Sequence, residues 1–406
     1  MELTKVALIK EGKVPPDKRV ALTPQQCVYL TERFPQLRIV VQKSEIRAIP
    51  DSDYAAAGID VASDISDADI MIGVKEVNID DLIPRKTYLF FSHTYKKQPY
   101  NRELLRAILE KSIRLVDYEV MTYPDGGRVL GFGRYAGIVG AYNTLLAYGE
   151  KTGRYTLKPA HECEDRREVE CELEKVKVNP DFRMVITGKG RVGAGAREII
   201  DQLDIREVNH ADYLESEFNY PVFTHIDVGE YNTHKEGKPF DRKHFFAYPE
   251  EYRSAFLPFA HRSDVYIACH YWSAKAPFLF TREDAKDPNF SLKVVGDISC
   301  DINGPVASTI RPSTIAEPLY GYNPNTEQEV DFLEKGAIGV MAVDNLPCEL
   351  PKDASEDFGQ ELKEKVIPPL IGEDVDKIIW RATETLNNGT LAPHFAYLQE
   401  YVDGKD

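Results

Sequence analysis

Short apolar runs that end in a polar residue recur along the first third of the chain. They cover residues 5–9, 70–74, 88–92 and 114–118, and helical patterns lie between them at 25–33, after the capping pair Thr23-Pro24, and at 102–109. Continuous apolar strands that alternate with helices are typical of a parallel sheet covered on both faces. The pattern therefore predicts an α/β domain at the start of the chain.

Three of these predicted strands are followed by a residue that can take part in proton transfer. Lys75, His93 and Glu119 each stand just past an apolar run. Ligands of parallel sheets bind beyond the carboxyl ends of the strands, so we expect these three side chains to come together. Each alone has a plainer explanation, as a solvated loop charge or a hydrogen-bonded structural histidine. Their shared register favours a site that holds an acid, a base and a tuning carboxylate.

A glycine turn near the middle of the chain has the sequence context of a dinucleotide-binding fingerprint. The β-branched run 185–187 leads into Gly188, Gly190 and Gly193, and residues 192–203 read as a helix. Gly188 allows the tight turn, Gly190 lets backbone amides approach a pyrophosphate, and Gly193 lets the helix pack on the strand. We predict a nucleotide site here, with an ordinary strand-to-helix turn as the alternative.

Later runs at 207–209, 264–270 and 293–298 read as strands of the same sheet as the glycine turn. The last two end in 271–273 and 300–303, where a nicotinamide would lie. A ribose-binding acid is expected about 20 residues past the first glycine, but that window holds Asn209 and His210, and Asp212 is the nearest acid. The choice between NAD and NADP therefore stays open. A strand at 337–343 and helices at 354–366 and 374–386 complete the predicted elements.

The predicted elements divide into two Rossmann-like, doubly wound domains with a cleft between them. Small residues at helical spacing predict a helix over 135–148 that leads from the first domain into the second. We predict a substrate domain formed by residues 1–138 and about 310–406, and a dinucleotide-binding domain formed by 139–309. Residues 158–180 are rich in charges of both signs, which indicates an exposed excursion.

Composition limits the classes of function. The 406 residues carry a net charge of −16, so binding to nucleic acid would meet repulsion, and a small-molecule substrate fits better. No apolar run approaches the roughly 20 residues that a bilayer requires, and the first ten residues do not resemble a signal peptide, so we expect a cytoplasmic protein. The six cysteines are scattered without metal-ligand spacing, which predicts reduced thiols and no metal site.

Several stretches, spread over nearly the whole chain, resemble one enzyme family. They are residues 18–24, 73–76, 93–98, 116–119 and 127–137, the glycine turn, 297–301 and 344–355. Taken together they resemble the NAD-dependent, lysine-forming saccharopine dehydrogenases. The wider group also holds alanine dehydrogenase and the nucleotide-binding part of proton-translocating transhydrogenase. The block 93–137 favours saccharopine dehydrogenase, although Gly127-Arg128 stands where relatives often carry two arginines.

The resemblance implies a reaction and a set of site residues. The reaction is the NAD-dependent oxidative cleavage of saccharopine, a CH–NH donor, to L-lysine and 2-oxoglutarate, or the reverse reductive condensation, through an imine. Lys75 and His93 would be the acid and base pair, with Glu119 modulating them. The residues expected to line the amino-acid site are Arg19, Gln98, Arg128 and Phe132, and we add Tyr271, Trp272 and Ser273. The residues expected at the cofactor are Gly188, Gly190, Arg191, Val192, Gly193, Asp212, Asp301, Ile302 and Asn303.

Other interpretations stay open on the sequence alone. From spacing alone, Arg19 is equally compatible with a solvated loop arginine. An alanine-type dehydrogenase, or another oxidoreductase that forms an imine, would share Arg19, Lys75 and His93. A nucleotide or amino-acid sensor would need no proton-transfer pair, which argues against that class. Saccharopine-type relatives suggest a monomer, and alanine-type relatives assemble.

Overall fold

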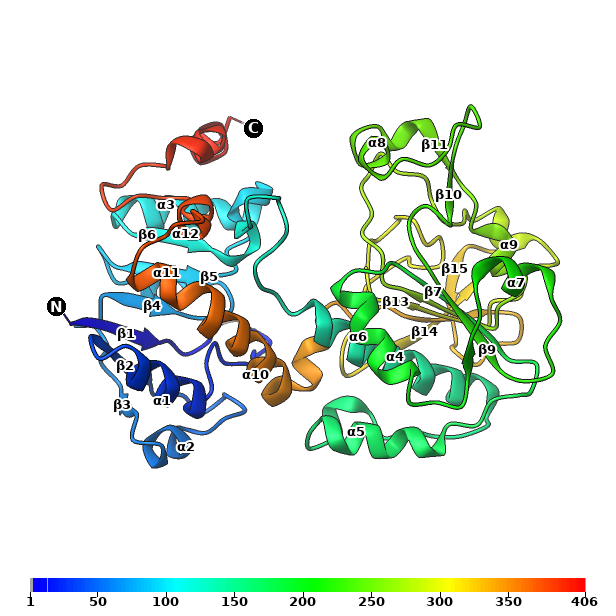
Figure 1. Cartoon of the computed structure of the whole chain (residues 1–406), viewed down its shortest axis with the longest axis horizontal. Helices are drawn as coiled ribbons and strands as arrows, with labels where there is room; N and C mark the ends of the chain where they lie inside the picture. Colours follow the sequence, from blue (N-terminus) through cyan, green and yellow to red (C-terminus); the bar gives the residue numbers. More distant parts are fainter. Residues whose placement is uncertain (1–2, 13, 406) are drawn as a thin grey trace. The chain divides into compact units, whose positions relative to one another are not determined.

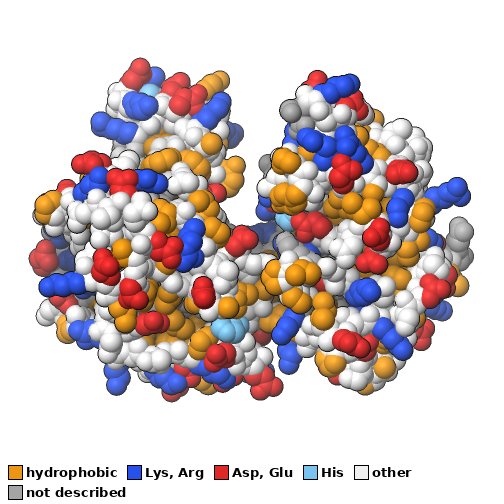
Figure 2. All heavy atoms as spheres, turned by 180° about the vertical axis from the view of Figure 1, so that it is seen from behind, with side chains coloured by type: hydrophobic (Ala, Val, Ile, Leu, Met, Phe, Trp, Pro, Cys, Tyr) orange, Lys and Arg blue, Asp and Glu red, His pale blue; other side chains and the backbone are white. Residues whose placement is uncertain are grey.

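The computed structural model describes residues 3–12 and 14–405 and divides them into two compact units (Figure 1). Unit 1 comprises residues 1–132 and 351–406, and unit 2 comprises residues 133–350. No helix in the described part of the chain is both long and apolar enough to cross a bilayer. On the face drawn in Figure 2, positive and negative side chains are interspersed, so no continuous basic surface is seen there.

Unit 1 is built on a six-stranded parallel sheet with the strand order β3-β2-β1-β4-β5-β6. Its strands are β1 (Thr4–Leu8), β2 (Leu37–Gln42), β3 (Asp60–Ala62), β4 (Ile70–Ile72), β5 (Thr87–Phe90) and β6 (Arg114–Asp117). The four apolar runs read from the sequence form β1, β4, β5 and β6, whereas β2 and β3 were not predicted. Strand β4 is buried along its whole length because helices cover both faces. The predicted parallel sheet is confirmed.

Helices from both ends of the chain cover this sheet. They are α1 (Pro24–Arg33), α2 (Asp51–Ala56), α3 (Arg102–Glu110), α10 (Pro351–Glu361), the π-helix η10 (Leu362–Val366), α11 (Ile367–Ile371), α12 (Ile378–Ala382) and α13 (Gln399–Asp403). Thr23 and Gln26 form a reciprocal capping box at the start of α1. Phe358 and Leu362 pack in the same core as Leu8 and Ile72, so the orange helices of Figure 1 close one face of the sheet.

The helix predicted over 374–386 is only partly present. The structure forms α12, and the chain then runs extended, with Thr383 bridged antiparallel to Val116 at the open edge of β6. Glu384 donates its backbone N–H to the carbonyl of Leu115, and the Leu115 N–H donates to the Thr385 hydroxyl. The threonine-rich segment thus provides hydrogen-bond partners for backbone groups of β6 at the edge of the sheet.

Unit 2 is built on an eight-stranded sheet with the order β15-β14-β16-β13-β12-β7-β9-β8. The strands are β7 (Arg183–Thr187), β8 (Arg206–Glu207), β9 (Val222–Ile226), β12 (Val265–Ala268), β13 (Val294–Asp297), β14 (Leu319–Asn323), β15 (Gln328–Val330) and β16 (Ile338–Met341). Only β14 pairs antiparallel with its neighbours. A separate hairpin joins β10 (Asn232–His234) to β11 (Tyr252–Ser254).

The helices of unit 2 are α4 (Gly133–Thr152), α5 (Arg166–Glu172), α6 (Arg191–Ile200), α7 (His210–Glu215), α8 (Arg242–Ala247) and α9 (Leu257–Ala260). Unit 2 also has the short 3-10 turns η5 (Ala160–Glu162), η6 (Leu173–Lys175), η7 (Pro249–Glu251), η8 (Asp284–Lys286) and η9 (Leu346–Glu349). The 3-10 turns of unit 1 are η1 (Ile79–Asp81), η2 (Thr94–Lys96), η3 (Pro99–Asn101), η4 (Tyr118–Val120) and η11 (Pro393–Leu398). The parallel strands and alternating helices confirm the α/β, Rossmann-like class of the fold.

The chain returns to unit 1 later than predicted. The boundary lies between Leu350 and Pro351, well after the expected position near residue 310. The reason is that β14, β15 and β16 extend the sheet of unit 2 beyond β13, so the segment after residue 310 is held by strand pairing. The first boundary, at residues 132 and 133, comes just before the expected 138 because α4 belongs to unit 2 from its first turn.

The charged segment 158–180, predicted as an exposed excursion, is folded and mostly exposed. It contains α5, where Asp165 caps the helix and Val169 is buried. Arg166 binds Glu170 at 2.7 Å and Glu198 of α6 at 2.7 Å. The alternating charges therefore attach this segment to α6 through ion pairs at its exposed face.

Helices α4 and α6 pack with their backbones in contact. A Cβ atom on Gly137 would lie 1.9 Å from the carbonyl oxygen of Val192, and one on Gly195 would lie 1.9 Å from that of Arg134. No side chain fits at either position without separating the helices. The small residues noted in the sequence are thus required by the helix pair that supports the glycine turn.

A buried carboxyl group fixes the end of β4. Glu11, three residues after β1, accepts the backbone N–H of Val74 at 2.7 Å and that of Lys75 at 2.9 Å. Only 9% of its surface is exposed, and burial raises the pKa of its carboxyl from 4.5 to about 7, against the two amides that favour the charged form. The position of Lys75 therefore depends on a group that titrates near neutral pH.

We expect Gly137→Ala to destabilise unit 2. The better helix propensity of alanine gains about 1 kcal/mol, whereas overpacking two backbones costs about 3 kcal/mol or more, so the free energy of unfolding should fall. Urea unfolding followed by circular dichroism measures the change. The control is Gly190→Ala, where a Cβ would meet no atom within 4 Å, and it should cost less than about 1 kcal/mol. Equal losses in the two variants would contradict the close-packing argument.

We expect Glu11→Gln to flatten the dependence of stability on pH. Between pH 4.5 and about 7 the folded carboxyl keeps a proton that the unfolded one has lost, so the free energy of unfolding falls as the pH rises through this window, by on the order of 3 kcal/mol in total. Glutamine lowers stability by a pH-independent amount, because its amide accepts only one of the two N–H groups. Melting temperatures from pH 4.5 to 8, with the exposed Glu45→Gln as control, measure the slope. Parallel curves for Glu11→Gln and the native chain would refute the assignment.

Candidate active site

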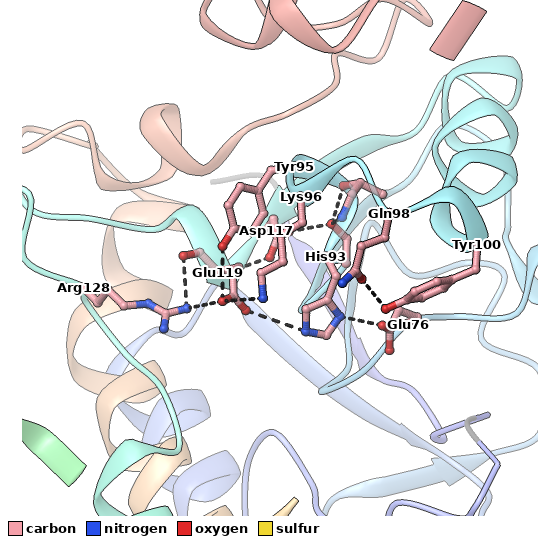
Figure 3. A network of polar contacts seen from close by, with 11 residues as sticks. Glu76, His93, Tyr95, Lys96, Gln98, Tyr100, Asp117, Glu119 and Arg128 are labelled. Atoms are coloured by element: carbon pink, nitrogen blue, oxygen red, sulfur yellow. Dashed lines mark hydrogen bonds and ion pairs between the residues drawn. The ribbon is translucent and has the colours of Figure 1, made fainter. Parts of the chain in front are cut away.

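The predicted proton-transfer residues lie at one edge of the unit 1 sheet. Lys75 follows β4, His93 follows β5 and Glu119 lies in η4 directly after β6. Strands β4, β5 and β6 are parallel neighbours, so their carboxyl ends share one edge. Figure 3 shows His93 and Glu119 pointing toward each other there.

His93 lies between two carboxylates. Its Nδ1 is 2.6 Å from the Oε1 of Glu76, and its Nε2 is 3.8 Å from the Oε2 of Glu119 (Figure 3). Its backbone φ of 55° is left-handed, which is strained for a residue other than glycine and turns the ring toward this edge. The hydrogen bond to Glu76 orients the ring and favours a proton on Nδ1, which leaves Nε2 to exchange protons with a reactant.

Glu119 is surrounded by cationic groups. Its Oε1 lies 3.0 Å from Nη2 of Arg128, 3.4 Å from Nζ of Lys96 and 3.5 Å from the Tyr95 hydroxyl. Burial acts to raise the pKa of this carboxyl, but Arg128, Lys96 and His93 outweigh it and hold the pKa below its ordinary value. Glu119 is therefore an anion at neutral pH and can stabilise positive charge on the His93 ring.

Lys75 lies near Phe91 and Asp17. Its Nζ is 6.0 Å from the centre of the Phe91 ring, and its charge helps to lower the pKa of Asp17, although less than Arg19 does. Glu11 fixes its backbone N–H. Glu76 binds His93, and Lys75 adds to the positive charge around Asp17.

Arg19 is fully engaged in an internal ion pair. It donates from Nη2 to Asp17 at 2.6 Å and from Nε at 3.0 Å, and both side chains are 2% exposed. Its guanidinium lies 4.1 Å from the centre of the Phe132 ring, which in turn stacks on Phe358 at 4.5 Å. By contrast, the Arg128 side chain is 49% exposed. Gln98, from the same edge, accepts a hydrogen bond from the Tyr100 hydroxyl (Figure 3).

A buried polar network lies beneath His93 and Glu119. Asp117, at the end of β6, accepts the Ser92 hydroxyl at 2.5 Å and the backbone N–H of Glu119 at 2.7 Å. The Thr94 hydroxyl lies 2.5 Å from that of Ser92 and donates to Glu384 at 2.6 Å. Asp117 and Glu384 are fully buried. Ser92 and Thr94, the two chain neighbours of His93, are therefore both fixed by hydrogen bonds within the buried network.

The glycine turn of unit 2 has the predicted geometry. Gly188, with φ of 89°, connects β7 to the turn, and a Cβ on Gly193 would lie 1.9 Å from the Gly188 carbonyl oxygen. Gly190 is the N-cap of α6 and has no atom within 4 Å of its Cβ position, and no side chain caps the helix. Helix α6 therefore begins, as predicted, at a glycine turn with room at its N-cap.

The strand next to β7 is β9, and not the segment near residue 207 that the sequence suggested as the second strand. That segment forms β8, at the edge of the sheet beyond β9. Asp212 follows it in the first turn of α7, where it is exposed, and Asn209 is the N-cap of this helix. The residues that follow β9 are Asp227 and, three further, Glu230. Glu230 lies 3.6 Å from Lys189 in the glycine turn and 2.9 Å from Nδ1 of His210.

The remaining predicted residues follow the two strands on the other side of β7. Trp272 donates its indole N–H to the carbonyls of Ala276 and Pro277 in the loop after β12, between the exposed Tyr271 and the half-buried Ser273. Asp301 follows β13, where burial and Asp297 raise its pKa to about 6. Ile302 is partly exposed, and the Asn303 side chain accepts a hydrogen bond from Arg282.

Sequence reasoning missed several residues that the structure brings to these edges: Glu76, Lys96, Asp117, Glu230 and Glu384. Glu76 was within reach of the argument because it directly follows Lys75 at a strand end. Lys96 and Glu384 gave no signal, because they meet their partners only through turns and long-range pairing.

Comparison with known proteins gives the same grouping. Residues 7–139 match the family model described as alanine dehydrogenase/PNT, N-terminal domain. The mitochondrial α-aminoadipic semialdehyde synthase of Mus musculus is 29% identical over 99% of this chain and 48% of its own length. The chain thus spans about half the length of the first curated relatives it matches. The NAD⁺, L-lysine-forming saccharopine dehydrogenase of Schizosaccharomyces pombe is 28% identical over 90% of this chain and 93% of its own.

Among solved structures, an L-alanine dehydrogenase superposes on 99% of this chain with a TM-score of 0.67 and 16% identity. A transhydrogenase from Sinorhizobium meliloti covers 96% with a TM-score of 0.61 and 15% identity. These likenesses concern the fold. The chain is thus similar to saccharopine dehydrogenases over most of its length, and to the alanine dehydrogenase/PNT N-terminal domain over residues 7–139.

Proposed function

We propose that this chain is an oxidoreductase of the amino-acid dehydrogenase type that cleaves saccharopine to L-lysine and 2-oxoglutarate with NAD, or runs the reverse condensation. The observation that carries the proposal is His93 held between Glu76 and Glu119 at the strand edge that also carries Lys75. Such a group of acids and bases serves a reaction with several proton transfers. The similarity to fungal saccharopine dehydrogenases over most of the chain supports the choice of substrate.

Lys75 is proposed to take the proton of the secondary amine. A bound nicotinamide would supply the acceptor for the hydride that leaves the glutaryl carbon. His93 then takes a proton from the water that adds to the resulting imine carbon and passes it to the nitrogen of the carbinolamine. As the C–N bond breaks and lysine leaves, His93 accepts the hydroxyl proton, so that the carbonyl group of 2-oxoglutarate forms. Glu76 keeps the His93 ring oriented, and the anionic Glu119 stabilises its positive charge between the two transfers.

Arg128 is proposed to bind a substrate carboxylate. Its side chain is half exposed and lies on Glu119, so a substrate can take one of its N–H groups without breaking a buried pair. Arg19 already binds Asp17 in a closed, bidentate geometry. We propose that Arg19 contributes to the amino-acid site through Phe132, whose ring it covers.

For the cofactor we propose NAD, with the pyrophosphate on the first turn of α6 and the adenosine ribose at Glu230. The carboxylates of Asp227 and Glu230 follow the strand adjacent to β7, where a ribose-binding acid is expected in this fold. Their negative charge favours ribose hydroxyls over a 2′-phosphate.

An absorbance assay for reduced nicotinamide separates the candidate activities. The chain is offered saccharopine, then lysine with 2-oxoglutarate, then pyruvate with ammonia, each with the matching redox form of NAD or NADP. Turnover with saccharopine, and with lysine plus 2-oxoglutarate, supports the proposal. Turnover with pyruvate and ammonia alone would assign an alanine-type dehydrogenase, and nucleotide binding without turnover a sensor.

We expect Lys75→Met to lower kcat by about 10²- to 10⁴-fold, the usual contribution of a positioned acid or base. The affinity for the cofactor, measured by fluorescence titration, should stay unchanged because unit 2 holds the glycine turn. Lys10→Met, which removes an exposed lysine of unit 1, is the control and should retain full turnover. A Lys75→Met chain with native kcat would remove Lys75 from the mechanism.

We expect Glu230→Gln to weaken NAD binding about tenfold, equivalent to about 1.4 kcal/mol, and to leave NADP binding equal or stronger. The physical reason is the loss of a charged acceptor for the ribose hydroxyls. Isothermal titration of both cofactors measures the ratio, with the exposed Glu283→Gln as control. An unchanged ratio of the two dissociation constants would place the ribose elsewhere.

A further inference from the structure

Three potential metal ligands converge in the hairpin lobe of unit 2, which contains β10, α8, η7 and β11 (Figure 1). They are His234 at the end of β10, His244 in α8 and Glu251 at the end of η7. One ligand atom from each lies within 4.8 Å of the others. These three residues take no part in the proposed reaction, and no sequence motif predicted that they would lie together.

Local structure fixes all three side chains. His234 pairs with Tyr252 in the β10–β11 ladder, so Glu251, the preceding residue, stands beside it. Asp241 caps α8 by accepting the backbone N–H of His244. The His244 ring packs 5.7 Å from that of His234 and 5.9 Å from that of Tyr252. Convergence of the three groups is therefore a result of packing and not of one flexible side chain.

The spacing of the ligand atoms is that of a coordination shell. The Oε2 of Glu251 lies 3.3 Å from Nε2 of His234 and 3.7 Å from Nε2 of His244. In a tetrahedral zinc site with bonds of about 2.0–2.1 Å, neighbouring ligand atoms are about 3.4 Å apart. The Nε2 of His234 is buried, and among the described residues it has no hydrogen-bond partner. Its nearest acceptor is the Glu251 carboxylate at 3.3 Å, which does not form a hydrogen bond with it, and a metal ion between the two groups would satisfy both.

The contacts behind the ligands decide which nitrogen is available. Nδ1 of His244 is 3.1 Å from the Tyr252 hydroxyl, an arrangement that can hold the proton on Nδ1 and present the Nε2 lone pair. Nδ1 of His234 accepts the backbone N–H of Glu236 at 3.1 Å. Binding through Nε2 of His234 therefore moves its proton to Nδ1 and turns the Glu236 amide, in an exposed loop, toward water.

We propose that His234, His244 and Glu251 bind one divalent transition-metal ion of the zinc type. Two imidazoles and a carboxylate suit Zn²⁺, Co²⁺ or Ni²⁺, whereas Mg²⁺ and Ca²⁺ prefer all-oxygen shells. The side chains of His244 and Glu251 are 37% and 46% exposed, so a water can complete the shell. The ion would fasten α8 to the hairpin, and α8 carries Arg242, which binds Asp227 at the end of β9.

The test uses the full chain after treatment with a chelator. Titration with Co²⁺, followed by visible absorption, should give the d–d bands of a tetrahedral N/O site at one equivalent per chain, and Zn²⁺ should displace it and raise the melting temperature. His244→Gln and Glu251→Gln should each weaken Co²⁺ binding at least tenfold. Glu250→Gln removes the same charge at the next exposed position and should bind like the native chain.

Three outcomes would overturn the proposal. They are the absence of stoichiometric binding, an affinity unchanged by both ligand substitutions, and thiolate charge-transfer bands, which would assign the ion to cysteines. None of these readouts depends on turnover, so they leave the proposed reaction untouched.

Discussion

The buried carboxyl of Asp117 is the point on which the architecture of unit 1 depends. It lies at the end of β6 with Glu384 as its buried neighbour. Burial raises the pKa of both groups, and the charge of Asp117 raises that of Glu384 further. Asp117 accepts hydrogen bonds from the Ser92 hydroxyl and from the Glu119 backbone N–H. The same group thereby joins the last segment of the chain to the two turns that carry the site.

This arrangement explains how a histidine in a strained conformation is kept in place. A left-handed φ at a residue other than glycine costs about 1–3 kcal/mol and persists only where the surroundings over-determine it. His93 has a residue with a buried, bonded hydroxyl on each side, Ser92 and Thr94. Hydrogen bonds of Ser92 and Thr94 to buried groups thus offset the conformational cost at His93. The His93 ring nitrogens take no part in these bonds, so one can bind Glu76 and the other is available for the proposed proton transfer.

The sequence was sufficient to predict β1, β4, β5 and β6 and the edge that the last three share, because apolar runs and the parallel rule depend on local composition, but it did not reveal β2, β3, β9 or β14. Lys75, His93 and Glu119 were reached in that way. The buried partner of Asp117 could not be predicted from the sequence, since Glu384 lies 267 positions away along the chain. The two residues meet only because an extended threonine segment, which had been predicted as helix, pairs with β6. Glu230, which we propose for the cofactor ribose, was missed for a related reason. Strand order in the sheet places β9 beside β7, and order in the chain does not reveal this.

The two arginines implied by the family resemblance differ in what they can do. Arg19 forms a bidentate pair with Asp17 in which both side chains are 2% exposed, and removing either partner from a buried pair costs about 3–5 kcal/mol. A substrate carboxylate that replaced Asp17 would have to overcome a cost of that size. Arg128 contacts Glu119 across a half-exposed surface, where an exposed pair is worth about 0–1 kcal/mol, so an incoming carboxylate can share it. Occupation of Arg128 would also withdraw positive charge from Glu119, and this carboxylate would then act more strongly on His93 once substrate is bound.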